Sequence, residues 1–375
     1  MNITYLIGNG FDIALGLNTR YSNFIDYYCK LDKSGSPHLV KLQEMMGGQD
    51  PETKKFWSNA ERAFGELDWT AFAAPDDPIE VFRECLKDVQ VELENYLKSE
   101  ERRVRVPEGK AGVLAQHLFS RMVCLDRYMS PVHGANYREY VKQHNNHITL
   151  NFIVFNYTDT IERLWMGLQT DGHSGVRTCS ADLGGKVTIS VTPPCFVHGV
   201  FNRQWFMFGV DNPAQIKDQK IRAECEASGR LIKPYMDEDS GFGYMATAKK
   251  LLSSSETIVT YGLSLGSSDQ MWSDELYQQL FNNHRLLVIC PYYDEGRIPY
   301  HAGEAQMINL RTAVRNLFTP LAEAKKFEVD VSRKKIGSVR LLDEEWAGVK
   351  NPKCDYFDLE FINKEIVLKG GRNGQ

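Results

Sequence analysis

The sequence predicts an α/β fold: a Rossmann-like, mainly parallel sheet with a large helical insertion and a small β-rich C-terminal appendage. Three observations support this prediction. Four short apolar runs have the length and composition of buried strands, and helical patterns separate them, as in parallel sheets covered on both faces. The first two runs lie about 140 residues apart, which is far more than one crossover helix needs. Beyond about residue 325, apolar and polar residues alternate, which is typical of a strand.

The individual elements follow from these patterns. The four strands are expected at Ile3–Ile7, Ile148–Phe155, Thr257–Tyr261 and Leu286–Tyr293, and a further β pair at Lys186–Val191 and Phe206–Val210. Inside the insertion, Asp76-Asp77-Pro78 predicts the start of a helix, because Asp caps a helix and Pro suits its first position. The apolar residues after it recur at helical spacing: Phe82, Cys85, Leu86, Val89, Leu93, Tyr96 and Leu97. A second helix is expected over Gly112–Met129.

Three units are predicted from this order of elements. Residues 1–35 and 148–320 form a Rossmann-like nucleotide-binding domain, residues 36–147 form the helical insertion, and residues 325–375 form the β-rich C-terminal tail. Strands in the tail are expected at Phe327–Val331, Ser338–Leu342, Tyr356–Phe361 and Glu365–Leu368.

Composition and charge narrow the classes of function. Hydrophobic residues are 42% and charged residues 25% of the 375, which is ordinary for a soluble globular protein and argues against a disordered chain. The net charge of −5 supplies no basic field, so nucleic acid is not an expected partner. No apolar run approaches the roughly 20 residues of a membrane span, so no membrane partner is expected either. Eight scattered cysteines with no C-x-x-C pair indicate reduced thiols in a cytoplasmic protein, with neither a zinc ribbon nor another metal expected.

The strongest local signal lies where the first strand runs into Gly8-Asn9-Gly10 and a helix begins with Phe11 and Asp12. Glycines let backbone N–H groups approach a phosphate, and the N-terminus of a helix favours an anion. The spacing differs from the usual dinucleotide fingerprint, since the third glycine is Gly16, and no Lys follows as in a Walker A loop. Asp12 would also repel a pyrophosphate. The residues alone therefore fit a structural turn as well as a nucleotide site.

Two further polar positions follow predicted strands. Asn156 comes after Ile148–Phe155, and ligands of open α/β sheets bind at the carboxyl ends of strands. The alternative for Asn156 is an Asx turn that closes the strand, and for Asp159 a helix N-cap is the favoured interpretation. His198 precedes Gly199 after a short apolar run, where an imidazole could act as a base near neutral pH. The alternative is an ordinary surface or core histidine.

A fourth signal is Gly262-Leu263-Ser264-Leu265-Gly266, which follows a predicted strand. Gly262 and Ser264 could admit an adenosine or ribose and bond to it. The same residues match the Gly-x-Ser-x-Gly nucleophile elbow of α/β hydrolases, and an Asp and two His follow in the chain. A hydrolase would leave the other three signals unexplained, so it ranks below the nucleotide site.

Taken together, these motifs resemble the AbiH family of phage abortive-infection proteins. The resemblance spans residues 1 to about 320 and rests on Ile7–Asp12, Gly16-Leu17, Thr19–Ser22, Phe155–Thr160, His198-Gly199 and Tyr261–Gly266 with Asp269. Leu263 departs from the Gly-His-Ser expected of the family, and the tail lies outside the resemblance. The family implies a role in antiviral defence.

More distantly, the same positions are similar to the sirtuin-like fold. Gly8, Gly10 and Gly16 match its loop glycines, Asn156 matches its strand-end Asn, and His198 matches its catalytic His. Departures from its pattern are Asp12, Asn18 and the insertion of Tyr157-Thr158 before Asp159. The missing zinc ribbon argues against peptide deacylation and for the defence branch that hydrolyses NAD.

This resemblance implies that NAD is the substrate and that its nicotinamide–ribose bond is hydrolysed. Asn156 would position the ribose or the attacking water, and His198 would accept a proton. The residues implied to bind the nucleotide are Gly8, Asn9, Gly10, Phe11, Asp12, Thr19, Tyr21, Gly262 and Ser264. The alternative is a nucleotide-binding sensor or structural component without turnover. A homo-oligomer or a partner protein of the defence system is also implied.

Overall fold

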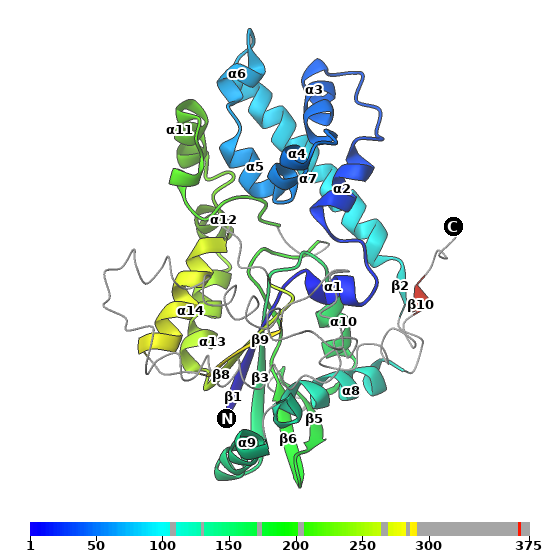
Figure 1. The fold of residues 1–375 in the computed structure, drawn as a ribbon, viewed down its shortest axis with the longest axis vertical. Helices are drawn as coiled ribbons and strands as arrows, with labels where there is room; N and C mark the ends of the chain where they lie inside the picture. Colours follow the sequence, from blue (N-terminus) through cyan, green and yellow to red (C-terminus); the bar gives the residue numbers. More distant parts are fainter. Residues whose placement is uncertain are drawn as a thin grey trace.

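The computed structural model describes residues 1–105, 110–128, 131–170, 175–201, 206–263, 269–282, 286–290 and 367–368. Over these residues the chain forms a mixed α/β structure, with one large sheet and a group of helices beyond one end of it (Figure 1). In this part of the chain, no helix is both long enough and apolar enough to cross a membrane.

The large sheet is mainly parallel. Its strands are β1 (Asn2–Ile7), β3 (His147–Val154), β4 (Gln169–Thr170), β5 (Arg177–Asp182), β6 (Lys186–Val191), β7 (Cys195–Phe196), β8 (Thr257–Tyr261) and β9 (Leu286–Cys290). They follow the order β4-β5-β6-β3-β1-β8-β9, and β7 pairs with β3 beyond the end of β6. β4 and β5 form an antiparallel edge.

The strand β1 lies at the centre of the parallel part. It pairs with β3, where Ile7 is opposite Val154, and with β8, where Ile7 is opposite Tyr261. Numbered along the chain, the parallel strands β1, β3, β6, β8 and β9 stand in the order 3-2-1-4-5, as in doubly wound nucleotide-binding sheets. The order therefore reverses between β1 and β8, and ligands of such sheets bind outside the carboxyl ends of the strands at this reversal.

Alternate residues of the strands enter hydrophobic cores on opposite faces of the sheet. Tyr5 and Phe152 belong to the core under α8 (Ala111–Val123) and α10 (Thr160–Met166). Leu6 and Ile153 belong to the core under α13 (Tyr244–Ser254) and α14 (Gln270–Asn282). This period of two is expected for strands that are covered on both faces.

A third core holds the helices that stand beyond the carboxyl ends of the strands (Figure 1). We name residues 21–101 and 206–232 the helical subdomain. It contains α2 (Tyr21–Tyr28), α3 (Pro37–Met46), α4 (Pro51–Trp57), α5 (Ala60–Glu66), α6 (Trp69–Ala73), α7 (Pro78–Glu101), the 3₁₀ turn η2 (Pro213–Gln215) and α11 (Gln219–Ser228). α7 begins where the sequence predicts, because the side chain of Asp77 accepts from the N–H of Ile79 at 3.0 Å and Pro78 follows it. Its predicted apolar face is buried.

The remaining elements connect these layers. They are α1 (Gly10–Ala14), the 3₁₀ turn η1 (Leu125–Tyr128), α9 (Pro131–Gln143) and α12 (Lys233–Ser240), with a separate antiparallel pair of β2 (Val104–Arg105) and β10 (Val367–Leu368). The predicted helix at Gly112–Met129 corresponds to α8, which ends at Val123 and is followed by η1.

The prediction of a mainly parallel α/β sheet is confirmed, and β8 has the predicted bounds. The chain does not form a plain Rossmann fold, because an antiparallel edge extends the sheet and the segments of the helical subdomain are inserted into the chain between the strands. The prediction of a strand at Phe206–Val210 is wrong. Phe208 and Val210 are buried in the core of the helical subdomain, and β6 pairs with β5 instead.

The predicted domain bounds differ from the distribution of the hydrophobic cores. α8 and α9 fall within the predicted insertion, residues 36–147, yet their buried residues join the core on the sheet. Residues 206–232 fall within the predicted nucleotide-binding domain, yet they contribute to the helical core. Of the tail, the described residues are Val367–Leu368 in β10, and the other three predicted strands lie outside the described residues.

Candidate functional site

Polar side chains gather at the carboxyl ends of the central strands. They follow β1, β3 and β7, precede α14, or come from helices α5 and α12: Asp12, Asn156, Tyr157, Thr158, His198, Asp269, Glu61 and Lys233. Because a buried charge is costly unless it is paired, such a group of charges in one place marks a candidate functional site. It lies at the reversal of strand order, where the fold class binds ligands.

The glycine turn after β1 packs directly against the loop after β8. The N–H of Gly8 donates to the carbonyl of Tyr261 at 2.8 Å, and the N–H of Gly10 donates to the carbonyl of Gly262 at 2.9 Å. A Cβ on Gly8 would lie 2.5 Å from Cα of Leu263, and a Cβ on Gly262, where φ is +61°, would lie 2.5 Å from Cα of Gly10. The contact between the loops therefore requires these glycines, and the two amides predicted to hold a pyrophosphate are bonded within the chain.

Three more residues of the predicted nucleotide site also have partners in the chain. The side-chain amide of Asn9 donates to the carbonyl of Thr19 at 2.9 Å, and the hydroxyl of Thr19 donates to Oδ1 of Asn9. Phe11 is fully buried in the sheet core, with its ring edge-on to that of Tyr261. These contacts fix the turn, and nucleotide binding by these residues stays a prediction.

Tyr21, also predicted to bind the nucleotide, lies at the start of α2. Its ring packs edge-on against Phe208, and its hydroxyl interacts with Tyr157 and Glu61. Burial raises the pKa of Tyr21 well above its ordinary value, and the charge of Glu61 raises it further. The phenol therefore stays protonated and joins the helical subdomain to the candidate site.

Asp12 supplies a buried carboxylate at the start of α1. Its Oδ2 accepts from the hydroxyl of Thr158 at 2.6 Å, whereas Oδ1 has no hydrogen-bond partner among the described residues. Burial raises the pKa of Asp12 to about 7, although contacts with Thr158, Thr160 and Asn156 lower it. At neutral pH the carboxyl is therefore partly protonated, and it repels an anion less than an ordinary aspartate would.

Asn156 is buried just after β3, and its side chain interacts with Asp12. Its Oδ1 likewise lacks a hydrogen-bond partner in the described part of the chain. An unpaired buried acceptor costs roughly 1–3 kcal/mol. A ligand that donates a hydrogen bond to this oxygen would recover that free energy.

His198 follows β7 and lies beside the end of β3. Its Nδ1 is 3.2 Å from the carbonyl oxygen of Phe155, and the two rings meet edge-on. A carbonyl oxygen can only accept, so Nδ1 carries the hydrogen and the neutral ring keeps its lone pair on Nε2. Nε2 is 3.2 Å from Oδ1 of Asp269, without a well-aligned hydrogen bond. This arrangement can accept a proton at Nε2, and the carboxylate stabilises the charged ring.

A buried lysine pairs with the same oxygen of Asp269. Nζ of Lys233 lies 2.9 Å from Oδ1 of Asp269 and 3.0 Å from Oε2 of Glu61. Burial lowers the pKa of Lys233, but the charges of Asp269 and Glu61 outweigh it and raise that pKa above its ordinary value. Burial raises the pKa of Asp269, but Lys233 and His198 outweigh it and hold that pKa well below its usual range. Lys233 and Asp269 are therefore both charged at neutral pH.

The segment after β3 connects these two groups of side chains. Asn156 and Thr158 interact with Asp12, whereas the carbonyl of Phe155 meets His198 and the hydroxyl of Tyr157 lies 2.5 Å from Oε1 of Glu61. Within the described residues the structure thus brings Asn156 to Asp12 and His198 to Asp269, and no hydrogen bond joins Asn156 to His198.

The sequence did not single out Glu61 or Lys233. Glu61 lies among other charged residues of a helix and carries no distinguishing pattern. Lys233 follows Leu231-Ile232 in an apolar stretch. A lysine in an apolar stretch is a sign of a buried ion pair, since lysine is almost never buried unless it is paired.

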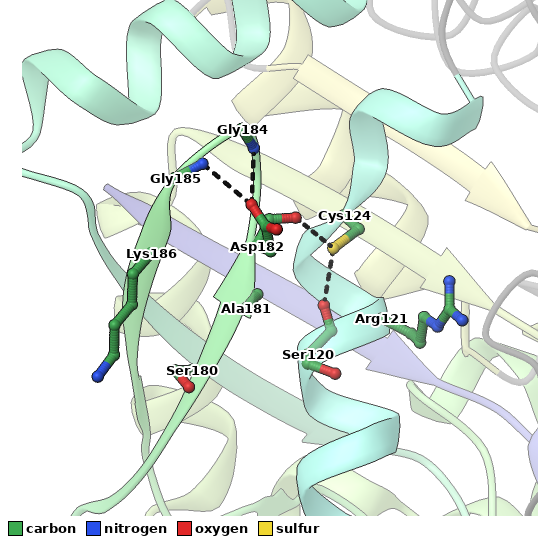
Figure 2. A pocket seen from close by; sticks show the side chains of 9 residues that line it. All are labelled: Ser120, Arg121, Cys124, Ser180, Ala181, Asp182, Gly184, Gly185 and Lys186. Carbon is green, nitrogen blue, oxygen red and sulfur yellow. Dashed lines mark hydrogen bonds between the residues drawn. The ribbon is translucent and has the colours of Figure 1, made fainter.

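Other predicted features lie elsewhere. Ser264 is outside the described residues, as are the Asp and His residues that a hydrolase would need. A hollow of about 610 Å³ lies between α8 and the turn from β5 to β6, and none of the predicted site residues lines it. Its two cationic side chains, Arg121 and Lys186, point away from each other (Figure 2). The described residues hold no cluster of three or more His, Cys, Asp or Glu side chains suited to a metal ion.

The family described as Bacteriophage abortive infection AbiH matches residues 4–290, which cover the large sheet, the helical subdomain and the whole candidate site. No curated protein matches the chain. Because the family match extends over more than half of its length, the chain belongs to the AbiH family of bacteriophage abortive-infection proteins.

Proposed function

We propose that the chain binds NAD at the candidate site and hydrolyses its nicotinamide–ribose bond. Membership of the AbiH family implies a role in abortive infection, and loss of NAD would halt the metabolism of an infected cell. One observation carries the proposal. Asp12 and Asn156, which interact at the carboxyl ends of β1 and β3, each keep a buried oxygen without a partner among the described residues.

Two unpaired acceptor oxygens favour a ligand that donates hydrogen bonds. The hydroxyls of a ribose can donate, whereas an ionised phosphate can only accept. The amides of Gly8 and Gly10, which could have donated to a phosphate, are bonded to the loop after β8. The chemistry of these residues therefore supports contact with a sugar of the nucleotide rather than with its pyrophosphate.

The proposed reaction uses these side chains and a water molecule. The bond between C1′ of the ribose and the ring nitrogen of nicotinamide breaks, and its electron pair leaves with the nicotinamide. The ribose carries an oxocarbenium-like charge, which the carboxylate of Asp12 can stabilise. Water adds to C1′ and gives its proton to Nε2 of His198, while Asn156 orients the ribose or the water. The products are nicotinamide and ADP-ribose.

The test is to incubate the purified protein with NAD and to separate the products by chromatography. Replacing the site residues, Asn156→Ala or His198→Ala, is expected to lower turnover about 10²–10⁴-fold while the circular dichroism spectrum stays that of the wild type. His147→Ala is the matched control, because His147 lies at the opposite end of β3, where it contacts Ser190. Wild-type turnover in both site variants would refute the assignment, and tight NAD binding without product would instead indicate a sensor.

A further inference from the structure

One carboxylate oxygen faces both the proposed base and a buried lysine. Oδ1 of Asp269 lies 3.2 Å from Nε2 of His198 and 2.9 Å from Nζ of Lys233. We propose that Asp269 and Lys233 act as an opposed pair that sets the pH at which His198 takes up a proton. The role of this proton in catalysis rests on the proposed function, whereas the uptake of the proton by His198 does not.

The two charges act on His198 in opposite directions. The hydrogen on Nδ1 is fixed by the carbonyl of Phe155, so a proton added to the ring goes to Nε2, next to the carboxylate. A negative charge at this distance in a buried site strongly favours the charged ring. Lys233 approaches the same oxygen and opposes this effect. Without the lysine, His198 would hold its proton to higher pH and would be a poorer base near neutrality.

Other acidic groups lie around Asp269 and Lys233 and add to the negative charge near His198. Glu61 on α5 lies 3.0 Å from Lys233, and Asp211, which precedes η2, also faces the lysine and Asp269. Burial raises the pKa of Asp211 to about 7, although Lys233 lowers it. Tyr157 contributes a neutral hydroxyl. Three carboxyl groups therefore surround one lysine and one histidine, and the lysine offsets the negative charge that would otherwise act on the histidine.

A purely structural role for the pair would have a different signature. If Asp269 and Lys233 merely held the ring in place, removing either would loosen it toward the behaviour of a free imidazole. Both variants would then move the protonation of His198 in the same direction. An electrostatic role requires shifts in opposite directions.

Two substitutions separate these possibilities. Asp269→Asn removes the charge and keeps the shape, and its amide oxygen can still accept from Lys233. Lys233→Met alone would leave the carboxylates of Glu61 and Asp269 without their buried cation, which is strongly destabilising, so it is combined with Glu61→Gln. The glutamine keeps an oxygen to accept from Tyr157, and the double variant has the same net charge as the wild type.

The measurement is an NMR titration of the full chain labelled with ¹⁵N-histidine, without NAD, in which His198→Gln assigns the His198 signal. We expect the midpoint of this titration to fall by about one pH unit in Asp269→Asn and to rise by about one pH unit in the double variant. Shifts in the same direction, or no shift in either variant, would overturn the proposal.

A parallel experiment with NAD separates this inference from the proposed function. If the wild type turns over NAD, the acid limb of its pH profile for kcat/KM should move in the same directions as the titration. Opposite shifts of the titration in a protein that leaves NAD intact would support the inference and contradict the proposed function. Turnover of NAD without these shifts would support the proposed function and contradict the inference about Asp269 and Lys233.

Discussion

Replacing Asp12 with asparagine should make the stability of the protein less dependent on pH. The carboxyl is 1% exposed, and burial raises its pKa from 3.8 to about 7. Between these two values the folded protein keeps a proton that the unfolded chain releases. The stabilisation is therefore complete below pH 3.8 and is lost as the pH rises through 7.

The size of the effect follows from the two pKa values. A difference of about 3 in pKa corresponds to about 4 kcal/mol of unfolding free energy. Between pH 5 and pH 8, linkage gives a loss of about 2.5 kcal/mol for this one group. Because the side chain is buried, solvent does not screen this contribution appreciably.

Urea unfolding at pH 5 and pH 8 measures this effect in the wild type and in Asp12→Asn. Glu101 and Asp211, whose pKa values burial also raises to about 7, are present in both proteins and largely cancel in the comparison. We expect the wild type to lose about 2.5 kcal/mol more than the variant between these two pH values. An equal loss in both proteins would refute the argument that burial raises the pKa of Asp12 to about 7.

Two further predictions concern stability. Gly262→Ala should lower the free energy of unfolding by about 2–5 kcal/mol, because the added Cβ would overlap Gly10. Gly241→Ala is the control: this glycine also has a positive φ, +68°, but its Cβ would meet open space, so the loss should be about 1–2 kcal/mol. Equal losses in urea unfolding would contradict the contact between the loops. Tyr157→Phe should lower the free energy of unfolding by about 1–3 kcal/mol, because it removes the hydroxyl that donates to Oε1 of the buried Glu61. Tyr140→Phe, at an exposed position, is its control and should stay within about 0.5 kcal/mol of the wild type.

The parts of the fold that depend on local pattern were predictable. The strand at Thr257–Tyr261 is an apolar run between polar turns, and the helix that begins at Pro78 has a cap and a regular apolar face. Phe206–Val210 has the composition of a strand, but its apolar side chains pack among helices. Such an outcome depends on tertiary contacts, which override local preference.

The candidate site was predictable only where a residue follows a strand. Asn156 and His198 come directly after β3 and β7, so the fold class alone brings them to one edge of the sheet. Lys233 and Glu61 are 172 residues apart in the chain and meet through the packing of helices. No local pattern encodes that meeting. The turn at Gly8 was recognised for its glycines, but the sequence could not tell that a second glycine loop occupies the space beside it.

The position of β1 has a consequence for the synthesis of the chain. This strand leaves the ribosome before the other strands of the sheet, yet it occupies the middle of the sheet, and its neighbours β3 and β8 are made much later. At about 5–20 residues per second, about 10–50 s pass between the synthesis of β1 and that of β8. During this interval an apolar segment with two unpaired edges must be kept from aggregating. Nascent chains of this protein should therefore depend on chaperones more than those of a protein whose central strand is made last.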